Sequence, residues 1–166
     1  MKFENTKVFG TNNKDLKFIK VSVDITAPLY FFKELDTYKV GTVANSTSTM
    51  HKLASTPITI DCFEMDDFED CKDDSNVYVS AIWIESITRL EKLRQTYNAT
   101  KNKRYWKELI RLLPESWLQK RTITMNYENL LNMYRQRKNH KLTEWSKSFC
   151  DWVKTLYYAE ELICLE

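Results

Sequence analysis

The sequence has 166 residues, of which 43% are hydrophobic and 13% aromatic, and its formal net charge is +2. This apolar content suffices for a packed core and excludes a largely disordered chain, and the length predicts a single domain over residues 1–166. The net charge is too small to indicate a nucleic acid or a membrane surface as the partner.

The first third of the chain predicts one strand, one helix and an unusually polar segment. Residues 17–26 alternate apolar and polar side chains, which is typical of a strand with one buried face. Pro28 suits the first turn of a helix, and apolar residues follow at helical spacing from Leu29 to Leu35. Residues 36–52, DTYKVGTVANSTSTMHK, come directly afterwards and are rich in hydroxyl and amide side chains. They form either a binding loop or a polar connection.

The middle of the chain predicts an acidic loop followed by two helices. Residues 61–76 are strongly acidic but lack the alternating acids and central glycine of an EF-hand, so we expect a solvated surface loop. Apolar residues at the helical period predict a helix over 79–98. A second helix is expected over 101–114, because it must stop at Pro114.

The last third predicts two more helices after a short segment of uncertain type. Residues 119–126, QKRTITMN, are expected to form a connection or a strand. Asn126 is a plausible N-cap for a helix over 127–139. A long amphipathic C-terminal helix is marked by five apolar residues, namely Leu142, Trp145, Phe149, Trp152 and Leu156.

The cysteines and histidines do not predict a metal site. The four cysteines are Cys62, Cys71, Cys150 and Cys164. None belongs to a C-x-x-C pair, and there are only two histidines, so free thiols in a cytosolic protein are expected. The N-terminal residues lack the apolar run of a signal peptide, and no stretch reaches the ~20 apolar residues that span a bilayer. We therefore expect a soluble, cytoplasmic protein without a membrane partner.

An ordered series of motifs runs from residue 113 to residue 145. Its members are the pair Leu113-Pro114, the T-x-N of Thr124 and Asn126, the L-x-N of Leu130 and Asn132, and then Arg137, His140 and Glu144. This series resembles the C-terminal part of flavin-dependent thymidylate synthases, although His140 and Glu144 come one residue early. In that family the arginine at the position of Arg137 is implicated in holding the nucleotide substrate.

The polar segment resembles a second family motif, R-H-R-x-x-S-x-N-E-x-S-x-R, in a much altered form. Counted without gaps from Ala27-Pro28, the motif falls on the following residues: R-H-R on Thr37, Tyr38 and Lys39, the serines on Thr42 and Thr47, N-E on Ala44 and Asn45, and the last arginine on Thr49. A slip of one residue would instead match Asn45 with the asparagine and Ser48 with the second serine. In either alignment the terminal arginines and the glutamate are missing, and Glu128 stands where the family has a further arginine.

The resemblance implies a fold and an ancestral activity. The implied fold is α+β, with a small antiparallel or mixed sheet packed against several helices. The implied activity is methylation of deoxyuridine monophosphate with FAD as hydride carrier and a folate as one-carbon donor, in a homotetramer. Arginine binds phosphate through two parallel hydrogen bonds, which a threonine cannot do. The lost arginines therefore favour a protein without catalytic residues and without a bound cofactor, with FAD expected only if the family activity is retained.

The favoured interpretation is a catalytically inactive or repurposed nucleotide-binding protein that is a homo-oligomer. The candidate nucleotide-binding residues are Lys39, Thr42, Asn45, Ser46, Ser48, Asn126 and Arg137. Two structural alternatives stay open, because Asn126 could simply cap a helix and Arg137 could simply pair with a nearby acid.

The segments DTYKVG and RKNHKL are also similar to those of a group of small bacteriophage proteins. This likeness carries no function with it, but if the chain is a phage protein of the host cytoplasm, nucleotide binding is expected to mean sequestration of a nucleotide used in host defence. Two other functions remain: an active flavin-dependent thymidylate synthase, and a protein-interaction module that inhibits a host protein through exposed aromatic residues or the acidic loop.

Overall fold

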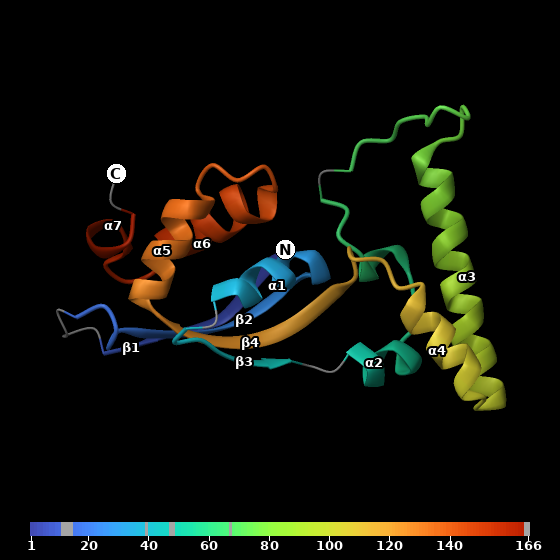
Figure 1. Cartoon of the computed structure of the whole chain (residues 1–166), viewed down its shortest axis with the longest axis horizontal. Helices are drawn as coiled ribbons and strands as arrows, with labels where there is room; N and C mark the ends of the chain where they lie inside the picture. The colour runs from blue at the N-terminus through green and yellow to red at the C-terminus, as the bar shows by residue number, and fades with distance from the viewer. Residues whose placement is uncertain (11–14, 39, 47–48, 67, 165–166) are drawn as a thin grey trace. The chain divides into compact units, whose positions relative to one another are not determined.

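The computed structural model describes residues 1–10, 15–38, 40–46, 49–66 and 68–164, without the side chains of 49–51. The chain forms two compact units, unit 1 (Met1–Ser46 and Gln119–Glu166) and unit 2 (Thr47–Leu118), which are coloured along the chain in Figure 1. The expectation of one domain over 1–166 stays a prediction. Lys39 and Ser48, two of the candidate binding residues, lie outside the described residues.

Unit 1 is built on a four-stranded sheet with the strand order β1-β2-β4-β3. The strands are β1 (Lys2–Phe9), β2 (Lys20–Pro28), β3 (Val43–Ser46) and β4 (Leu118–Asn126). β1 pairs antiparallel with β2, and β3 pairs antiparallel with β4. The α+β class with a small sheet is thereby confirmed. β2 is the strand predicted from alternation, and the segment that could have been a connection is β4.

The two faces of β2 differ because its residues alternate. Val21, Val23 and Ile25 are fully buried in the core, whereas Ser22 and Asp24 lie on the polar face. The Thr122 hydroxyl donates to Asp24 at 2.6 Å, and this bond, with further donors, lowers the pKa of Asp24 to about 2. Polar side chains thus link β2 to β4 on the face opposite the core.

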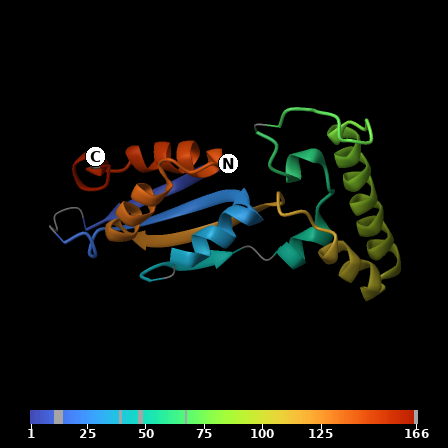
Figure 2. The same cartoon turned by 45° about the horizontal axis from the view of Figure 1, so that its top comes forward.

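The helices of unit 1 cover the apolar face of the sheet, and Figures 1 and 2 show α5, α6 and α7 on one side of it. The helical segments are α1 (Leu29–Leu35), η1 (Asp36–Tyr38), α5 (Tyr127–Arg137), η3 (Glu144–Phe149), α6 (Cys150–Lys154) and α7 (Ala159–Leu162). In the core, Phe31 of α1 stacks on Trp145 with ring centroids 4.2 Å apart. Stacked aromatic rings of this kind bury large apolar areas.

The long amphipathic C-terminal helix predicted from Leu142, Trp145, Phe149, Trp152 and Leu156 is present as one continuous helical run through η3 and α6, with its apolar stripe packed in the core. The chain forms a π-helical turn in η3, continues as the short α6, and changes direction at Tyr158, whose φ is 56°. The π turn places residues five apart on one side, so that Glu144 is buried with Phe149 and Trp145 with Cys150. The apolar stripe at the 3.6-residue period is kept, and the π turn adds the buried Glu144 to it.

Unit 2 is mainly helical. Its segments are α2 (Thr49–Ser55), η2 (Ile60–Cys62), α3 (Val79–Thr100) and α4 (Lys103–Arg111). α3 confirms the helix predicted over 79–98, and α4 ends before Pro114, as the sequence requires. A small apolar core comprises Leu53, Ile58, Phe63, Leu90, Leu109 and Trp117.

The acidic segment of unit 2 is partly built into its turns. Asp70 accepts hydrogen bonds from the backbone and the hydroxyl of Ser80, at 3.0 and 2.7 Å, in the first turn of α3. Asp73 accepts from the backbone nitrogens of Ser75 and Val77. Some of these acids therefore shape the local chain. The solvated loop expected over 61–76 stays a prediction as a whole.

No helix in the described part of the chain is long and apolar enough to cross a membrane. Within the same residues, no group of three or more His, Cys, Asp or Glu side chains is arranged to hold a metal ion. All four cysteines are free thiols.

Candidate functional site

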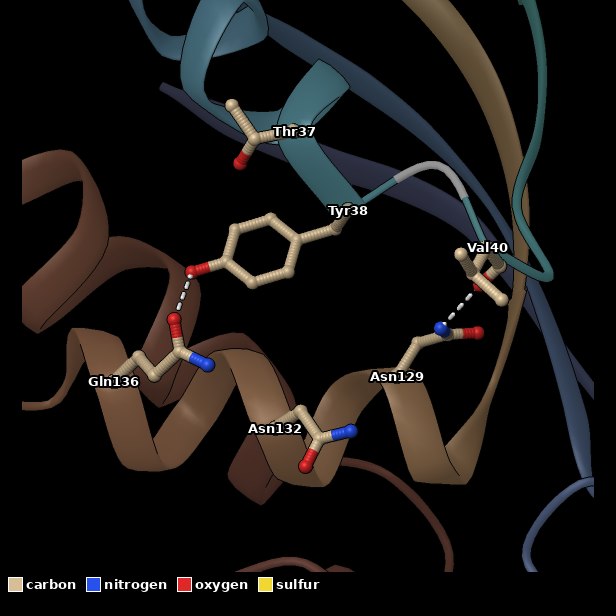
Figure 3. A pocket seen from close by; sticks show the side chains of 6 residues that line it. All are labelled: Thr37, Tyr38, Val40, Asn129, Asn132 and Gln136. Atoms are coloured by element: carbon tan, nitrogen blue, oxygen red, sulfur yellow. Dashed lines mark hydrogen bonds between the residues drawn. The ribbon is translucent and has the colours of Figure 1, made fainter.

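A pocket of about 420 Å³ opens in unit 1 between the end of η1 and one face of α5 (Figure 3). Its lining residues are Thr37, Tyr38, Val40, Asn129, Asn132 and Gln136. The lining is a tyrosine ring, one valine and four neutral polar side chains. Such a surface can stack a flat ring and hydrogen-bond the edge of a heterocycle.

α5 supplies three amides to this pocket because of its helical period. Asn129, Asn132 and Gln136 are spaced i, i+3 and i+7 and so share one face of the helix. The buried face, which includes Leu130 and Met133, packs into the core. The helix therefore presents amides to the pocket because its apolar residues fix its rotation.

The start of α5 is held by a reciprocal cap. Asn126 accepts a hydrogen bond from the Asn129 backbone nitrogen at 2.9 Å, and the Asn129 side chain accepts from the Asn126 backbone nitrogen. The Asn129 amide nitrogen also donates to the Val40 carbonyl at 2.6 Å, which Figure 3 shows as a dashed line. Asn126 is thus the N-cap of α5, and Asn129 ties the loop after η1 to the helix.

Gly41 allows the loop to pass close to this cap. Its φ is +78°, and an added Cβ would lie 3.1 Å from the Asn129 amide oxygen and 3.2 Å from the Asn126 amide nitrogen. Both the backbone conformation and the space favour glycine here. The DTYKVG motif therefore has a structural reason to end in glycine.

Tyr38 connects the pocket to the arginine behind it. Its hydroxyl donates to the Gln136 amide oxygen at 2.9 Å and accepts from Arg137 Nε at 3.0 Å. Both bonds restrict the ring that forms one wall of the pocket. The Asn132 side chain has no protein hydrogen-bond partner among the described residues, so its amide can bind a ligand in the pocket.

Arg137 is held by neighbours on three sides. Its Nη1 lies 2.9 Å from Glu34 Oε2, and its guanidinium lies over the Trp145 ring at 5.1 Å and the Tyr38 ring at 5.5 Å. His140 Nε2 is 3.5 Å from the same Glu34 oxygen. The nearby acid that the sequence left open as a partner for Arg137 is therefore Glu34.

A second arginine is neutralised in the same way. Arg121 of β4 lies 3.1 Å from Asp36, stacks over the Phe32 ring and donates to the Gln119 side chain. Both arginines that reach the α1–η1 segment are thus paired with one of its carboxylates, Arg137 with Glu34 and Arg121 with Asp36.

The remaining candidate residues are placed in two groups. Thr42 lies beside the pocket loop, where its hydroxyl donates to the Tyr38 carbonyl at 3.1 Å. Asn45 and Ser46 lie on β3, opposite Thr122 and Arg121, and are exposed. Neither is among the described residues that line the pocket. Their role in binding a nucleotide stays a prediction, as do those of Thr42, Asn126 and Arg137.

The comparisons with known proteins identify the fold. ThyX from Helicobacter pylori, a flavin-dependent thymidylate synthase complexed with FAD and dUMP, has a TM-score of 0.62 and 17% identity over 91% of this chain and 75% of that one. A second structure of that enzyme with FAD and dUMP has a TM-score of 0.61 and 17% identity over 89% and 72% of the two chains.

A related structure is the UMP/dUMP methylase PolB from Streptomyces cacaoi, bound with 5-Br UMP. Its TM-score is 0.59 and its identity 12%, over 86% of this chain and 71% of that one. No protein-family model and no curated protein sequence matches this chain. The chain therefore has the fold of the flavin-dependent thymidylate synthases, and the resemblance seen in the sequence is confirmed at the level of fold.

Proposed function

We propose that this protein binds a nucleotide in the pocket between η1 and α5 and does not perform flavin-dependent methylation. The observation that carries the proposal is the pocket itself, with the Tyr38 ring, the free Asn132 amide and the Gln136 amide facing one cavity. Its support from the comparisons is that proteins of this fold bind dUMP or 5-Br UMP.

The residues of the polar segment do not fit the FAD that ThyX binds. A flavin diphosphate needs cationic donors, and two of the hydroxyls of this segment are already used, since Thr37 donates to the Glu34 carbonyl at 2.7 Å and Thr42 to that of Tyr38. Glu128, in the first turn of α5, adds a carboxylate 3.8 Å from the Lys17 ammonium. These side chains disfavour a bound diphosphate.

The likeness to small bacteriophage proteins extends the proposal to a biological role. A phage protein that binds a nucleotide without consuming it would lower the free concentration of that nucleotide in the host cytoplasm. We therefore propose sequestration of a nucleotide used in host defence. This role needs affinity, and it needs no catalytic residue.

Replacing Asn132 by alanine is expected to weaken nucleotide binding about tenfold, because the pocket loses two hydrogen bonds of ~0.5–1.5 kcal/mol each. Isothermal titration against a panel of nucleoside monophosphates measures the effect. Asn139→Ala, an exposed asparagine just after α5, is the matched control and is expected to leave affinity unchanged. Absence of binding to every nucleotide at millimolar concentration, or a flavin absorption spectrum of the purified protein, would contradict the proposal.

A second candidate function is protein interaction, favoured by the exposed start of α3. Tyr78, Ile82 and Ile84 are 51%, 47% and 65% exposed, and Leu90 is the buried residue of this 22-residue helix. An apolar surface of this kind is typical of an interface. We propose a second copy of the chain as its occupant, in agreement with the homo-oligomer implied by the family resemblance.

Ile84→Asp is expected to lower the mass of the assembly in sedimentation equilibrium, because a carboxylate would be desolvated at the contact. Ala99→Asp, at an exposed position near the other end of α3, controls for the added charge. A wild-type protein that stays monomeric at high concentration would rule out self-association.

A further inference from the structure

We propose that Glu34 determines which part of a ligand the pocket recognises: by pairing with Arg137, it keeps this guanidinium from binding a ligand phosphate. The inference rests on the proposed nucleotide binding and adds which part of the nucleotide the pocket recognises. Base and sugar then supply the affinity, through Tyr38, Asn132 and Gln136, and the phosphate contributes little through Arg137.

The position of Arg137 makes it the natural phosphate ligand if it were free. It follows Gln136, which lines the pocket, and its Nε donates to the Tyr38 hydroxyl at 3.0 Å on the pocket wall. A guanidinium offers five donors in a fork that matches phosphate oxygens. Arg137 does not line the pocket itself, but it contacts Tyr38, which does, so a guanidinium that suits a phosphate lies directly behind the pocket wall.

Glu34 is paired with one nitrogen of that donor set. Its Oε2 lies 2.9 Å from Arg137 Nη1, and this oxygen is shielded from solvent. A carboxylate and a phosphate compete for the same guanidinium, and the carboxylate is tethered beside it at a high effective concentration. A ligand phosphate would have to displace Glu34 and leave a shielded carboxylate oxygen without its cation, which is unfavourable.

Glu34 and Arg137 form an ion pair whose geometry is not that of a directed hydrogen bond. Glu34 Oε2 has no partner in hydrogen-bond geometry, and its second neighbour, His140 Nε2, is 3.5 Å away. Glu34→Gln therefore removes the charge without removing a directed hydrogen bond. Arg137 would keep its contacts with the Tyr38 hydroxyl and the Trp145 ring.

The chain contains a matched control pair on the same segment. Asp36 and Arg121 also form an ion pair, at 3.1 Å, and the arginine again lies over an aromatic ring, that of Phe32. None of the four residues of the two pairs lines the pocket, but Arg137 donates to the Tyr38 hydroxyl on the pocket wall, whereas Arg121 donates to Gln119. Asp36→Asn thus removes a carboxylate of similar setting without freeing a guanidinium at the pocket.

The test compares deoxyuridine with dUMP by isothermal titration in the wild type, Glu34→Gln and Asp36→Asn. We expect Glu34→Gln to raise the affinity ratio of dUMP to deoxyuridine about tenfold or more, because a freed guanidinium gains charge-assisted bonds to phosphate. Asp36→Asn is expected to leave the ratio unchanged. The double variant Glu34→Gln/Arg137→Gln is expected to lose the gain.

The outcomes separate this inference from the proposed function. If both probes bind and the ratio does not change in Glu34→Gln, or changes equally in Asp36→Asn, the role of Glu34 is wrong and the nucleotide site stands. If neither probe, nor any other nucleoside and its monophosphate, binds wild type or variant, the proposed function itself fails. Should Glu34→Gln not fold, Glu34→Asp withdraws the carboxylate by one methylene and is expected to give a smaller rise in the ratio, whose absence overturns the inference.

Discussion

Replacing Trp145 by alanine is expected to lower the free energy of unfolding of unit 1 by about 3–5 kcal/mol. Trp145 is fully buried and packs on Phe31 at 4.2 Å and on Phe149 at 5.1 Å between ring centroids. Its removal leaves a large cavity that the surrounding rings cannot fill without leaving their rotamers. Hydrogen exchange resolved along the chain measures the loss in β2, β4 and α5.

The same substitution tests the support of the site. The guanidinium of Arg137 lies over the Trp145 ring, so Trp145→Ala is also expected to loosen Tyr38 and weaken ligand binding. Tyr157→Ala is the control. Because this ring is 58% exposed, its removal should lower the free energy of unfolding by less than about 1 kcal/mol. If the amides of unit 1 stay fully protected from hydrogen exchange after Trp145→Ala, the packing of Trp145 does not contribute the expected stability to the core.

The sequence predicted those elements whose pattern is local. β2 follows from strict alternation, α5 from its cap at Asn126 and its apolar face, and α3 from a long helical period. β3 was not predicted, because all four of its residues are exposed and its only signal is the pairing with β4. A strand stabilised by backbone bonds to a distant partner leaves no hydrophobic pattern in its own residues.

The candidate site was predictable in part. The resemblance indicated the polar segment and the region around Asn126 and Arg137, and the structure brings part of that segment, from Thr37 to Gly41, close to these two residues. The face formed by Asn129, Asn132 and Gln136 was missed, although its i, i+3, i+7 spacing opposite the apolar residues of α5 was visible.

Unlike the amide face of α5, the choice of Glu34 as the partner of Arg137 has no signal in the local sequence. These residues lie far apart in the sequence. Because α1 follows β2, α5 follows β4, and β2 and β4 are neighbours in the sheet, the two helices come together only in the folded chain. An arginine in a basic segment can bind a ligand or an internal acid, and composition does not distinguish the two. The choice depends on tertiary packing.

The polar cluster around Glu91 in unit 2 is expected to make the stability of this unit depend strongly on pH in the acid range. Glu91 of α3 accepts from Arg94 at 2.7 and 2.6 Å, from the Ile58 backbone nitrogen at 2.8 Å and from Gln95 at 2.9 Å. Arg94 also donates to the Ala54 carbonyl of α2 at 3.2 Å. The cluster thus fixes α2 and the following loop against α3.

These bonds, first of all those from Arg94, lower the pKa of Glu91 from 4.5 to about 2. Because the folded pKa lies below the unfolded one, the contribution is complete above pH 4.5 and is lost as the pH falls towards about 2. A shift of this size corresponds to about 3 kcal/mol, and the side chain is only 21% exposed. Glu91→Gln is therefore expected to destabilise unit 2 by about that amount at neutral pH and to flatten its acid dependence.

The control for Glu91 lies on the same helix. Glu85 pairs with Arg89 at 2.8 Å, but the two side chains are 65% and 74% exposed, so Glu85→Gln should cost at most about 0.5 kcal/mol. Hydrogen exchange in α3 between neutral and acidic pH separates the two variants. Equal effects of Glu85→Gln and Glu91→Gln would mean that unit 2 is held by its apolar core alone. A half-buried carboxylate with four hydrogen bonds and a solvated one would then contribute the same free energy of folding.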